Sequence, residues 1–453
     1  FNASAGDTIL ISEGVYGNPN ISKQLFIASI HHENLDSTII SNTILQSMTF
    51  LSSSSGSIIN GLTGALQIGN HSEGSSVIIN NCHFINNLYG IYVYGESTVT
   101  IDNCLISNNQ LGGIVAYSEN NNQFSNLTIN NSTIDNNSGI GIDCNHTNLT
   151  INNSTISNNS EFNEGTQYEH AAGINWDFWT EQNGTLTLDN VQIINNNGTG
   201  LKTWVQDNNN STLNNVTISG NKYRGIDGLK NATLDNCEIS YNEFGGLKEL
   251  TNVNIQNSVI SHNTVLTRDG GSAGAGINGI ENSTLTNVII EYNKTIDGGG
   301  GGIIVGNPNP NTTLENVTIR YNYAIYGGGI AQRGSGQFIE LSTGNKCNVY
   351  GNYATVGTDF HWENPTDGNV TIELDTFTVA SATSFYAYTE NGGNITIQSS
   401  NHVVDAQVQN VYVNPAGSNN NSGSSSSAPF KNIYYALLSI YANSGLPGTI
   451  HLA

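Results

Sequence analysis

The chain has 453 residues and is poor in charge, since 12 Lys and Arg stand against 35 Asp and Glu, for a formal net charge of -23. An acidic chain repels a phosphate backbone, so we expect no nucleic acid partner. No apolar run approaches the ~20 residues that a spanning helix needs, so we expect no membrane span.

The composition favours a repeat protein made of strands. The sequence contains 50 Gly but only 7 Pro and 1 Met, and it is rich in Asn, Ser and Thr. Ile alternates with polar residues along most of it. This alternation has the period of a strand rather than of a helix. A chain of this length would ordinarily hold several globular domains, unless its core grows in one dimension by repetition.

The chain opens on Phe1–Tyr16 (FNASAGDTILISEGVY), in which Asp7–Ser12 already has the alternation of a strand. From about residue 77 an eleven-residue frame returns along the chain, first as Val77–Asn87 (VIINNCHFINN) and then as Val99–Asn109 (VTIDNCLISNN). Later copies begin at Leu127, Leu149, Leu186, Ser211, Ala232, Val253, Ser283 and Thr312. The third, sixth and eighth residues of each copy are small or apolar, so we expect them to face a core.

Asn stands fifth in every copy, between two short predicted strands. A tight turn there needs a left-handed residue, which Asn tolerates better than any residue but Gly. Stacked Asn amides could also hydrogen-bond from coil to coil as a ladder. The fifth residues are Asn81, Asn103, Asn131, Asn153, Asn190, Asn215, Asn236, Asn257, Asn287 and Asn316.

A second Asn column closes the frame, and a third strand that opens with Gly follows it. The closing Asn column runs from Asn87 to Asn322, with Asn352 as its expected end, and pairs such as Gly113-Ile114 and Gly141-Ile142 open the third strands. Three strands therefore make one coil, and the frame recurs mostly every 21 to 30 residues. This spacing predicts an all-β solenoid.

These repeats resemble the pectin-lyase-like superfamily of parallel β-helices over nearly the whole chain, which implies a right-handed parallel β-helix. Thr318–Ile330 (TIRYNYAIYGGGI) and Ile290–Ile303 also resemble the repeats of polymorphic outer-membrane adhesins. The superfamily fold hosts lyases, hydrolases, adhesins and structural rods, so function has to be argued from a site.

The C-terminal part resembles the start of another such module. We expect a parallel β-helix over 1–368, a terminal β segment over 369–410, and over 411–453 a strand, a Gly/Ser loop, a capping helix and a strand. YANSGLPGTIHLA at the C-terminus is similar to FNASAGDTILIS at the N-terminus. We therefore predict that Val411–Ala453 of one copy covers the Phe1 end of the next, giving a head-to-tail filament or tandem array. The alternative is that the helix folds back and caps its own chain.

Five cysteines are present, an odd number with no close pair, which argues against a disulfide scaffold and a zinc site. Cys82 and Cys104 share the sixth frame position on adjacent coils. We expect stacked core thiols there, with one disulfide as the alternative. No metal or cofactor is predicted.

Asn-x-Ser/Thr sequons number about two dozen, and six of them immediately precede the first frame residue. Their Asn should lie on a loop along one edge of the solenoid, which predicts covalent N-glycans and an extracellular or cell-surface location. Sequons whose Asn is the fifth frame residue are poorer candidates for glycosylation, because that Asn forms the turn between two strands. The six are Asn126, Asn148, Asn210, Asn231, Asn282 and Asn311.

An enzymatic alternative rests on the residue after each Gly-Ile pair. This outward column holds, among others, Asp143, Lys202, Asp227 and Lys248, a carboxylate and amine set that catalysis on a glycan could use. The opposite charges could instead merely pair. Beside the column, the insertion Ser160–Asn183 contains the aromatic residues Tyr168, Trp176 and Trp179, which would suit a carbohydrate-binding surface or simply pack the insertion.

The sequence thus supports three functions. The first is a secreted structural or adhesive module that assembles head to tail and carries glycans. The second is a polysaccharide lyase or glycoside hydrolase. The third is a carbohydrate-binding surface without catalysis. No paired-Asp or Gly-His-Gly signature of polygalacturonases is present, so we expect the first.

Overall fold

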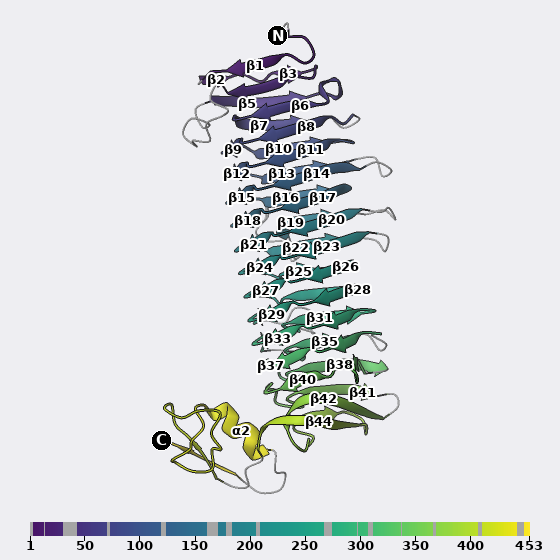
Figure 1. Cartoon of the computed structure of the whole chain (residues 1–453), viewed down its shortest axis with the longest axis vertical. Helices are drawn as coiled ribbons and strands as arrows, with labels where there is room; N and C mark the ends of the chain where they lie inside the picture. Colours follow the sequence, from purple (N-terminus) through teal and green to yellow (C-terminus); the bar gives the residue numbers. More distant parts are fainter. Residues whose placement is uncertain are drawn as a thin grey trace. The chain divides into compact units, whose positions relative to one another are not determined.

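The computed structural model describes residues 3–12, 14–29, 43–69, 73–118, 124–160, 171–177, 184–204, 209–266, 274–296, 298–306, 311–336, 338–365, 368–405, 410–441 and 448–453. These residues form two compact units, Phe1–Asn242 and Glu243–Ala453. Strands stack in successive layers along each unit (Figure 1).

In the first unit each coil has three short strands, as the frame predicts. The first strands are β6 (Ser57–Asn60), β8 (Ser76–Asn80), β11 (Thr98–Asp102), β14 (Ser125–Asn130), β17 (Thr147–Asn152), β20 (Thr185–Asp189), β23 (Asn210–Asn214) and β26 (Lys230–Asp235). The second strands are β9 (His83–Ile85), β12 (Leu105–Ser107), β15 (Thr133–Asp135), β18 (Thr155–Ser157), β21 (Gln192–Ile194), β24 (Thr217–Ser219) and β27 (Glu238–Ser240). The third strands are β7 (Thr63–Ile68), β10 (Tyr89–Tyr94), β13 (Gly112–Tyr117), β16 (Ile140–Asn145), β19 (Ala171–Asp177), β22 (Thr199–Trp204) and β25 (Ile226–Asp227).

The first coils of this unit are less regular. They contain β1 (Thr8–Ile11), β2 (Gly14–Tyr16), β3 (Asn20–Ile21), β4 (Phe26–Ser29), β5 (Thr43–Phe50) and the short 3-10 helix η1 (Ser52–Ser54). Strand β1 pairs in parallel with β4, which pairs with β6.

Like residues stack on like because every strand pairs in parallel with the strand one coil on. In β14, Leu127 lies opposite Val99 of β11 and Leu149 of β17, and these side chains are buried. The apolar positions of the frame thereby form continuous rows inside the solenoid, which is how a repeat protein builds its core.

The predicted turns are confirmed. All ten fifth-position Asn residues have φ between 49° and 56°, in the left-handed region. The Gly that opens a third strand is required for a different reason, because the backbone of the next coil comes very close to it. A Cβ on Gly113 would lie 2.5 Å from the carbonyl oxygen of Gly141. Only Gly fits where the backbone of the next coil comes so near.

The closing Asn column lies inside the solenoid, where Asn109, Asn137, Asn159, Asn196 and Asn221 are all buried. Each amide donates to the side-chain oxygen of the next Asn, as from Asn137 to Asn159 over 2.8 Å. The column is therefore an internal ladder of amides that satisfies buried backbone groups as well.

The second unit repeats the plan. Strand β28 (Leu247–Gln256) starts it, followed by β29 (Val259–Ser261), β30 (Thr264–Val265), β31 (Ile277–Glu281), β32 (Thr284–Thr286), β33 (Ile289–Glu291), β34 (Lys294–Thr295), β35 (Ile303–Val305), β36 (Thr313–Glu315), β37 (Thr318–Arg320), β38 (Ile330–Gly336), β39 (Glu340–Leu341), β40 (Cys347–Tyr350), β41 (Phe360–Pro365) and β43 (Ala387–Thr389). The two long strands β42 (Asn369–Val379) and β44 (Asn394–Val404) pair over most of their length.

The chain ends in β45 (Asn410–Val413), the helix α2 (Ile433–Tyr441) and β46 (Thr449–Leu452), with β45 and β46 paired in parallel. Helix α2 lies on its own unit, because the Tyr434 hydroxyl donates to the Gly351 carbonyl over 2.6 Å and the Tyr386 hydroxyl donates to the Leu438 carbonyl. This is the fold-back that the sequence left as the alternative. Among the described residues, no helix has the length and hydropathy to cross a membrane.

Candidate functional site

The third strands of the first unit place the predicted outward column in register. Val115 of β13 lies opposite Asp143 of β16, which lies opposite Asn175 of β19, and Asn175 lies opposite Lys202 of β22. Polar side chains one coil apart therefore project from the same face, about 4.8 Å from one another along the stack.

Asn175 joins two carboxylates on this face. Its Nδ2 lies 2.9 Å from Oδ1 of Asp143 and 2.9 Å from Oδ2 of Asp177. The two carboxylate oxygens are therefore no more than about 6 Å apart, which excludes the ~6.5–9.5 Å spacing of inverting glycosidases and leaves only the shorter spacing of retaining ones. We call Asp143, Asn175 and Asp177 the carboxylate cluster.

Burial perturbs both acids of the carboxylate cluster. Desolvation raises the pKa of Asp143, although the hydrogen bond from Asn175 opposes the rise. For Asp177 desolvation raises the pKa to about 6, while the Asn175 hydrogen bond and the nearby Lys202 ammonium lower it. A carboxyl group that holds its proton up to mildly acidic pH can act as a general acid.

Three tyrosines of β10 lie near the carboxylate cluster. The rings of Tyr92 and Tyr94 stack with centroids 4.3 Å apart, and Tyr89 meets Tyr92 edge-on at 5.3 Å. Burial raises the pKa of Tyr92, and the Asp143 carboxylate adds to this effect. The Tyr92 phenol therefore stays protonated and can donate a hydrogen bond at neutral pH.

The two other charged residues of the predicted set, Asp227 and Lys248, do not join the carboxylate cluster. Asp227 is opposite Lys202 in register but is buried, and its carboxylate pairs with the Arg224 guanidinium at 3.4 Å. Lys248 belongs to the second unit, where its ammonium lies 3.3 Å from the Glu249 carboxylate. Asp227 therefore keeps its predicted register position opposite Lys202, but it is buried there and paired with Arg224 rather than exposed as we expected.

The insertion with aromatic residues supports a carbohydrate-binding surface less than the sequence predicts. Trp176 is fully buried, and its indole N–H donates to the Thr147 carbonyl over 2.8 Å, so it is a core residue on which no sugar can stack. Tyr168 and Trp179 lie outside the described residues. Asp177, in contrast, falls within the predicted insertion Ser160–Asn183 but lies in β19, where the strand alternation continues through it.

The predicted glycan column also forms a partial ladder. Asn148 donates its amide to Asn126 over 3.0 Å, and Asn311 donates to Asn282 over 3.2 Å. Asn126, Asn210 and Asn282 are exposed, and among the described residues their own amide nitrogens have no hydrogen-bond partner. Asn148 and Asn231 are half-buried.

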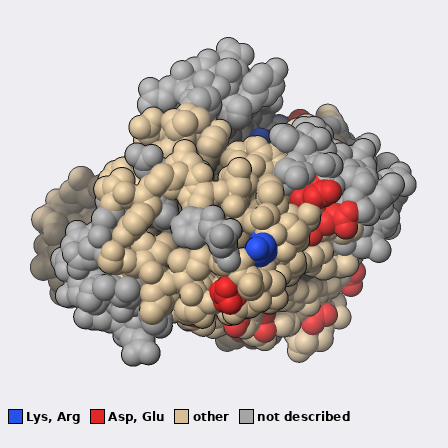
Figure 2. All heavy atoms as spheres, turned by 90° about the horizontal axis from the view of Figure 1, so that it is seen from above, with Lys and Arg blue, Asp and Glu red and all other residues tan. Residues whose placement is uncertain are grey.

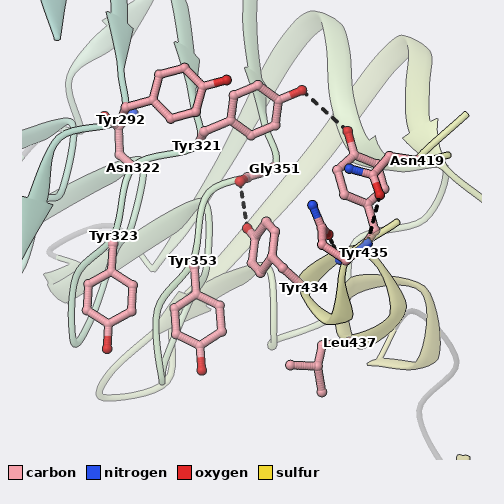
Figure 3. A pocket seen from close by; sticks show the side chains of 11 residues that line it. Tyr292, Tyr321, Asn322, Tyr323, Gly351, Tyr353, Asn419, Tyr434, Tyr435 and Leu437 are labelled. Atoms are coloured by element: carbon pink, nitrogen blue, oxygen red, sulfur yellow. Dashed lines mark hydrogen bonds between the residues drawn. The ribbon is translucent and has the colours of Figure 1, made fainter. Parts of the chain in front are cut away.

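Sequence reasoning missed a groove in the second unit. It has a volume of about 630 Å³ and is lined by tyrosines from neighbouring coils and by residues of α2 and the loop before it (Figure 3). We call it the tyrosine groove, formed by Tyr292, Tyr321, Tyr323, Tyr353, Tyr434 and Tyr435. The sequence signal was the Tyr-Asn or Tyr-Asn-Tyr ending of successive frame copies.

No described group of His, Cys, Asp and Glu side chains has the arrangement of a metal site. All five cysteines are buried free thiols, so Cys82 and Cys104 are stacked core thiols rather than a disulfide. The backbone N–H of Cys82 donates to Sγ of Cys104 at 3.4 Å, just as the N–H of Cys104 donates to Oγ of Ser132 at 3.0 Å.

With fold and sites established, comparison with known proteins places the chain in a family. The family described as right handed beta helix region matches residues 27–176 and 172–354. The chain belongs to this family of right-handed β-helix proteins, and the predicted right-handed parallel β-helix is confirmed.

Solved structures similar to this chain include carbohydrate-active enzymes. The Azotobacter vinelandii mannuronan C-5 epimerase AlgE6 A-module is 14% identical with a TM-score of 0.34, and the match covers 80% of this chain and 90% of that one. The catalytic domain of GH87 alpha-1,3-glucanase in complex with nigerose is 15% identical with a TM-score of 0.29, and the match covers 68% of this chain and 59% of that one. Pectate lyase Pel9A is 14% identical with a TM-score of 0.17, and the match covers 90% of this chain and 71% of that one. No curated protein sequence matches this chain.

Proposed function

We propose that this protein is a structural, adhesive β-helix module of the cell exterior that assembles head to tail with further copies of itself. The observation that carries the proposal is the uneven burial of α2. Its sequence, IYYALLSIY, is apolar or aromatic on every side except Ser439. A helix of this kind is normally buried all round.

In this chain α2 is covered on one side. Ala436, Leu438 and Ser439 are buried against their own unit, whereas Ile433 is 47% exposed. Tyr435, Leu437 and Ile440 of the same helix are only partly buried, so the helix leaves further apolar area uncovered. The helix can therefore cap its own last coils and still offer apolar area to a second copy.

A complementary surface lies on the first coils of the first unit. Leu10 is 54% exposed and Val15 is 65% exposed, next to a groove of about 470 Å³ lined by Ile9, Ile11, Pro19 and other mainly uncharged residues. Seen from above, the visible described surface is mostly uncharged, and acidic residues gather toward its margin (Figure 2). Among the described residues, β1 pairs only with β4.

The internal repeat indicates which element fits this groove. Strand β46 corresponds to β1 in the aligned ends of the chain, with Ile450 in the place of Ile9. Ile450 packs against the cluster of Val411, Val413, Phe430 and Ala436, which includes a residue of α2. We infer that the groove over β1 accepts the α2 region of a second copy, added to the fold-back contact rather than replacing it.

Sedimentation velocity over a concentration series tests this assembly. Leu10→Asp and Ile433→Asp each place a charge in the proposed contact, and both should leave a monomer where the unchanged chain forms assemblies that grow with concentration. The matched control is Leu88→Asp, because Leu88 is 60% exposed but belongs neither to the lining of the groove over β1 nor to α2. A monomeric unchanged chain at high concentration, or equal effects of all three substitutions, would refute the proposal.

We also propose that N-glycans cover the edge with the sequon column. Asn126, Asn210 and Asn282 support this because these residues are exposed and their amide nitrogens have no hydrogen-bond partner among the described residues. Peptide mapping of protein from its natural source should find glycans at these three positions before Asn148, whose amide is engaged. Bare Asn at all three would contradict the proposal.

The carboxylate cluster favours glycoside hydrolysis as a second candidate function. Asp177, with a pKa raised to about 6, would donate a proton, and Asp143 would serve as the second carboxylate. Reducing-sugar release from a polysaccharide panel near pH 5.5 tests it, with Asp177→Asn as the inactive variant and Asp235→Asn as the control. No release by the unchanged chain would remove this candidate.

A further inference from the structure

We propose that the tyrosine groove of the second unit binds a neutral oligosaccharide. The proposal is independent of assembly and of the carboxylate cluster, which lies in the first unit. It rests on two ladders of aromatic rings, on amide and hydroxyl groups that have no hydrogen-bond partner among the described residues, and on a lining without charge.

The first ladder occupies a strained backbone position. His262, Tyr292 and Tyr321 have φ of 55°, 55° and 57°, a region that bulky residues rarely adopt. In the first unit this frame position holds Asn86, Asn108 and other small residues until its last copy, where Tyr241 has φ of 57°. Strain that recurs on three consecutive coils is typical of a functional surface.

Stacking holds this ladder in place. The centroids of His262 and Tyr292 are 5.0 Å apart, and those of Tyr292 and Tyr321 are 5.2 Å apart. The Tyr321 hydroxyl lies 3.3 Å from that of Tyr435, which joins the ladder to the helix side of the groove (Figure 3). Since the ring faces cover one another, the ladder offers ring edges and hydroxyls to a ligand.

The second ladder forms the other wall. Tyr323 and Tyr353 stack at 5.1 Å, and Tyr353 meets Tyr434 edge-on at 5.5 Å. In Figure 3 the hydroxyls of Tyr323 and Tyr353 point the same way, and among the described residues neither has a hydrogen-bond partner. Two parallel phenol hydroxyls one coil apart suit a ligand with repeated hydroxyl groups.

The loop before α2 supplies amide donors. Oδ1 of Asn419 accepts from the backbone N–H groups of Lys431 and Asn432 at 3.0 Å and 3.2 Å, so the orientation of this side chain is fixed. Its Nδ2 donates to no described residue, although Asn419 lines the groove. Preorganised polar groups of this kind give a pocket its specificity.

The ligand class follows from size and charge. A volume of about 630 Å³ holds a small organic ligand, and no residue that lines the groove is charged. Two cations lie over groove tyrosines without lining the groove: Lys294 is 5.5 Å from the Tyr323 ring centroid, and Arg320, paired with Glu291 at 2.7 Å, is 5.7 Å from that of Tyr321. A chain with a net charge of -23 also disfavours an anionic ligand. A neutral, polyhydroxylated chain of sugars matches these groups.

Isothermal titration of the full chain tests this site. The probes are neutral hexasaccharides of glucose, mannose and xylose, with hexagalacturonate as an acidic arm and a proline-rich peptide as a different class. We expect at least one neutral hexasaccharide to bind, with affinity lowered about tenfold by Asn419→Asp, which keeps the acceptor and removes the donor. The double variant Tyr323→Phe/Tyr353→Phe should have a similar effect.

Tyr388→Phe is the matched control, because Tyr388 is a half-buried tyrosine of the same unit that stacks on His361 at 5.7 Å outside the groove. Circular dichroism confirms that each variant is folded. The proposal is overturned if no neutral hexasaccharide binds, if only the acidic probe or the peptide binds, or if groove and control variants bind equally well.

Discussion

The side chain of Asn137 accepts two hydrogen bonds from Asn109. Its Oδ1 lies 2.8 Å from Nδ2 and 3.0 Å from the backbone nitrogen of Asn109. Nδ2 of Asn137 in turn lies 2.8 Å from Oδ1 of Asn159 and 3.2 Å from the Ile106 carbonyl. Each buried Asn thus serves the coil before it and the coil after it.

Asn137→Ala should therefore destabilise the first unit by about 3 kcal/mol or more, because it leaves a buried backbone N–H and a buried carbonyl without partners. Urea unfolding followed by circular dichroism measures the loss. A change below about 1 kcal/mol would show that the buried closing Asn column contributes little to stability.

The ladder formed by the fifth-position Asn residues should contribute less to stability than the buried closing Asn column. Asn236 has φ of 54° and donates to Asn215 over 3.1 Å, but it is exposed. Asn236→Ala should cost about 1–2 kcal/mol, mainly through the left-handed backbone. Asn236→Gly should cost less, since Gly adopts this conformation freely. Equal losses for Ala and Gly would assign the effect to the hydrogen bond instead.

The turns, the core rows and the Gly-led strands could be predicted because one residue type recurs at one frame position. The left-handed conformation of Tyr292 could not, because a bulky aromatic is normally excluded there and only stacking on Tyr321 reveals why it is tolerated. The burial of Asp227 depends on Arg224, three residues earlier in a turn outside the frame. The tyrosine groove joins residues more than 80 positions apart, such as Gly351 and Tyr434, which no local pattern connects.

A buried acid makes the second unit sensitive to pH. Burial raises the pKa of Asp359 to about 7, although hydrogen bonds from Thr378 and Asn352 lower it. The folded state therefore holds a proton that the unfolded state releases near pH 4, so this group's contribution to stability falls as pH rises from about 4 to about 7.

Asp359→Asn should remove this dependence and stabilise the unit at pH 8, because it replaces a buried charge at the end of the Asn ladder with an amide. Urea unfolding at pH 5 and pH 8 compares the two proteins. A variant that is less stable than the unchanged chain at pH 8 would show that the carboxylate is well accommodated there.

The five cysteines should behave as free core thiols. Burial raises the pKa of Cys104 and Cys144, which lowers their reactivity. Without a reducing agent, a thiol-specific reagent should modify all five in denaturant and none rapidly in the folded protein. A mass two hydrogens lower, with three reactive thiols, would instead reveal a disulfide.

Head-to-tail contact between copies is tested most directly by cross-linking across it. In the variant Leu10→Cys/Ile433→Cys, oxidation should produce a ladder of multimers on a non-reducing gel that collapses to monomer on reduction, while the control Leu88→Cys/Ile433→Cys should not. The native thiols are buried and do not interfere. Monomer alone, or the same ladder from the control, would contradict the account.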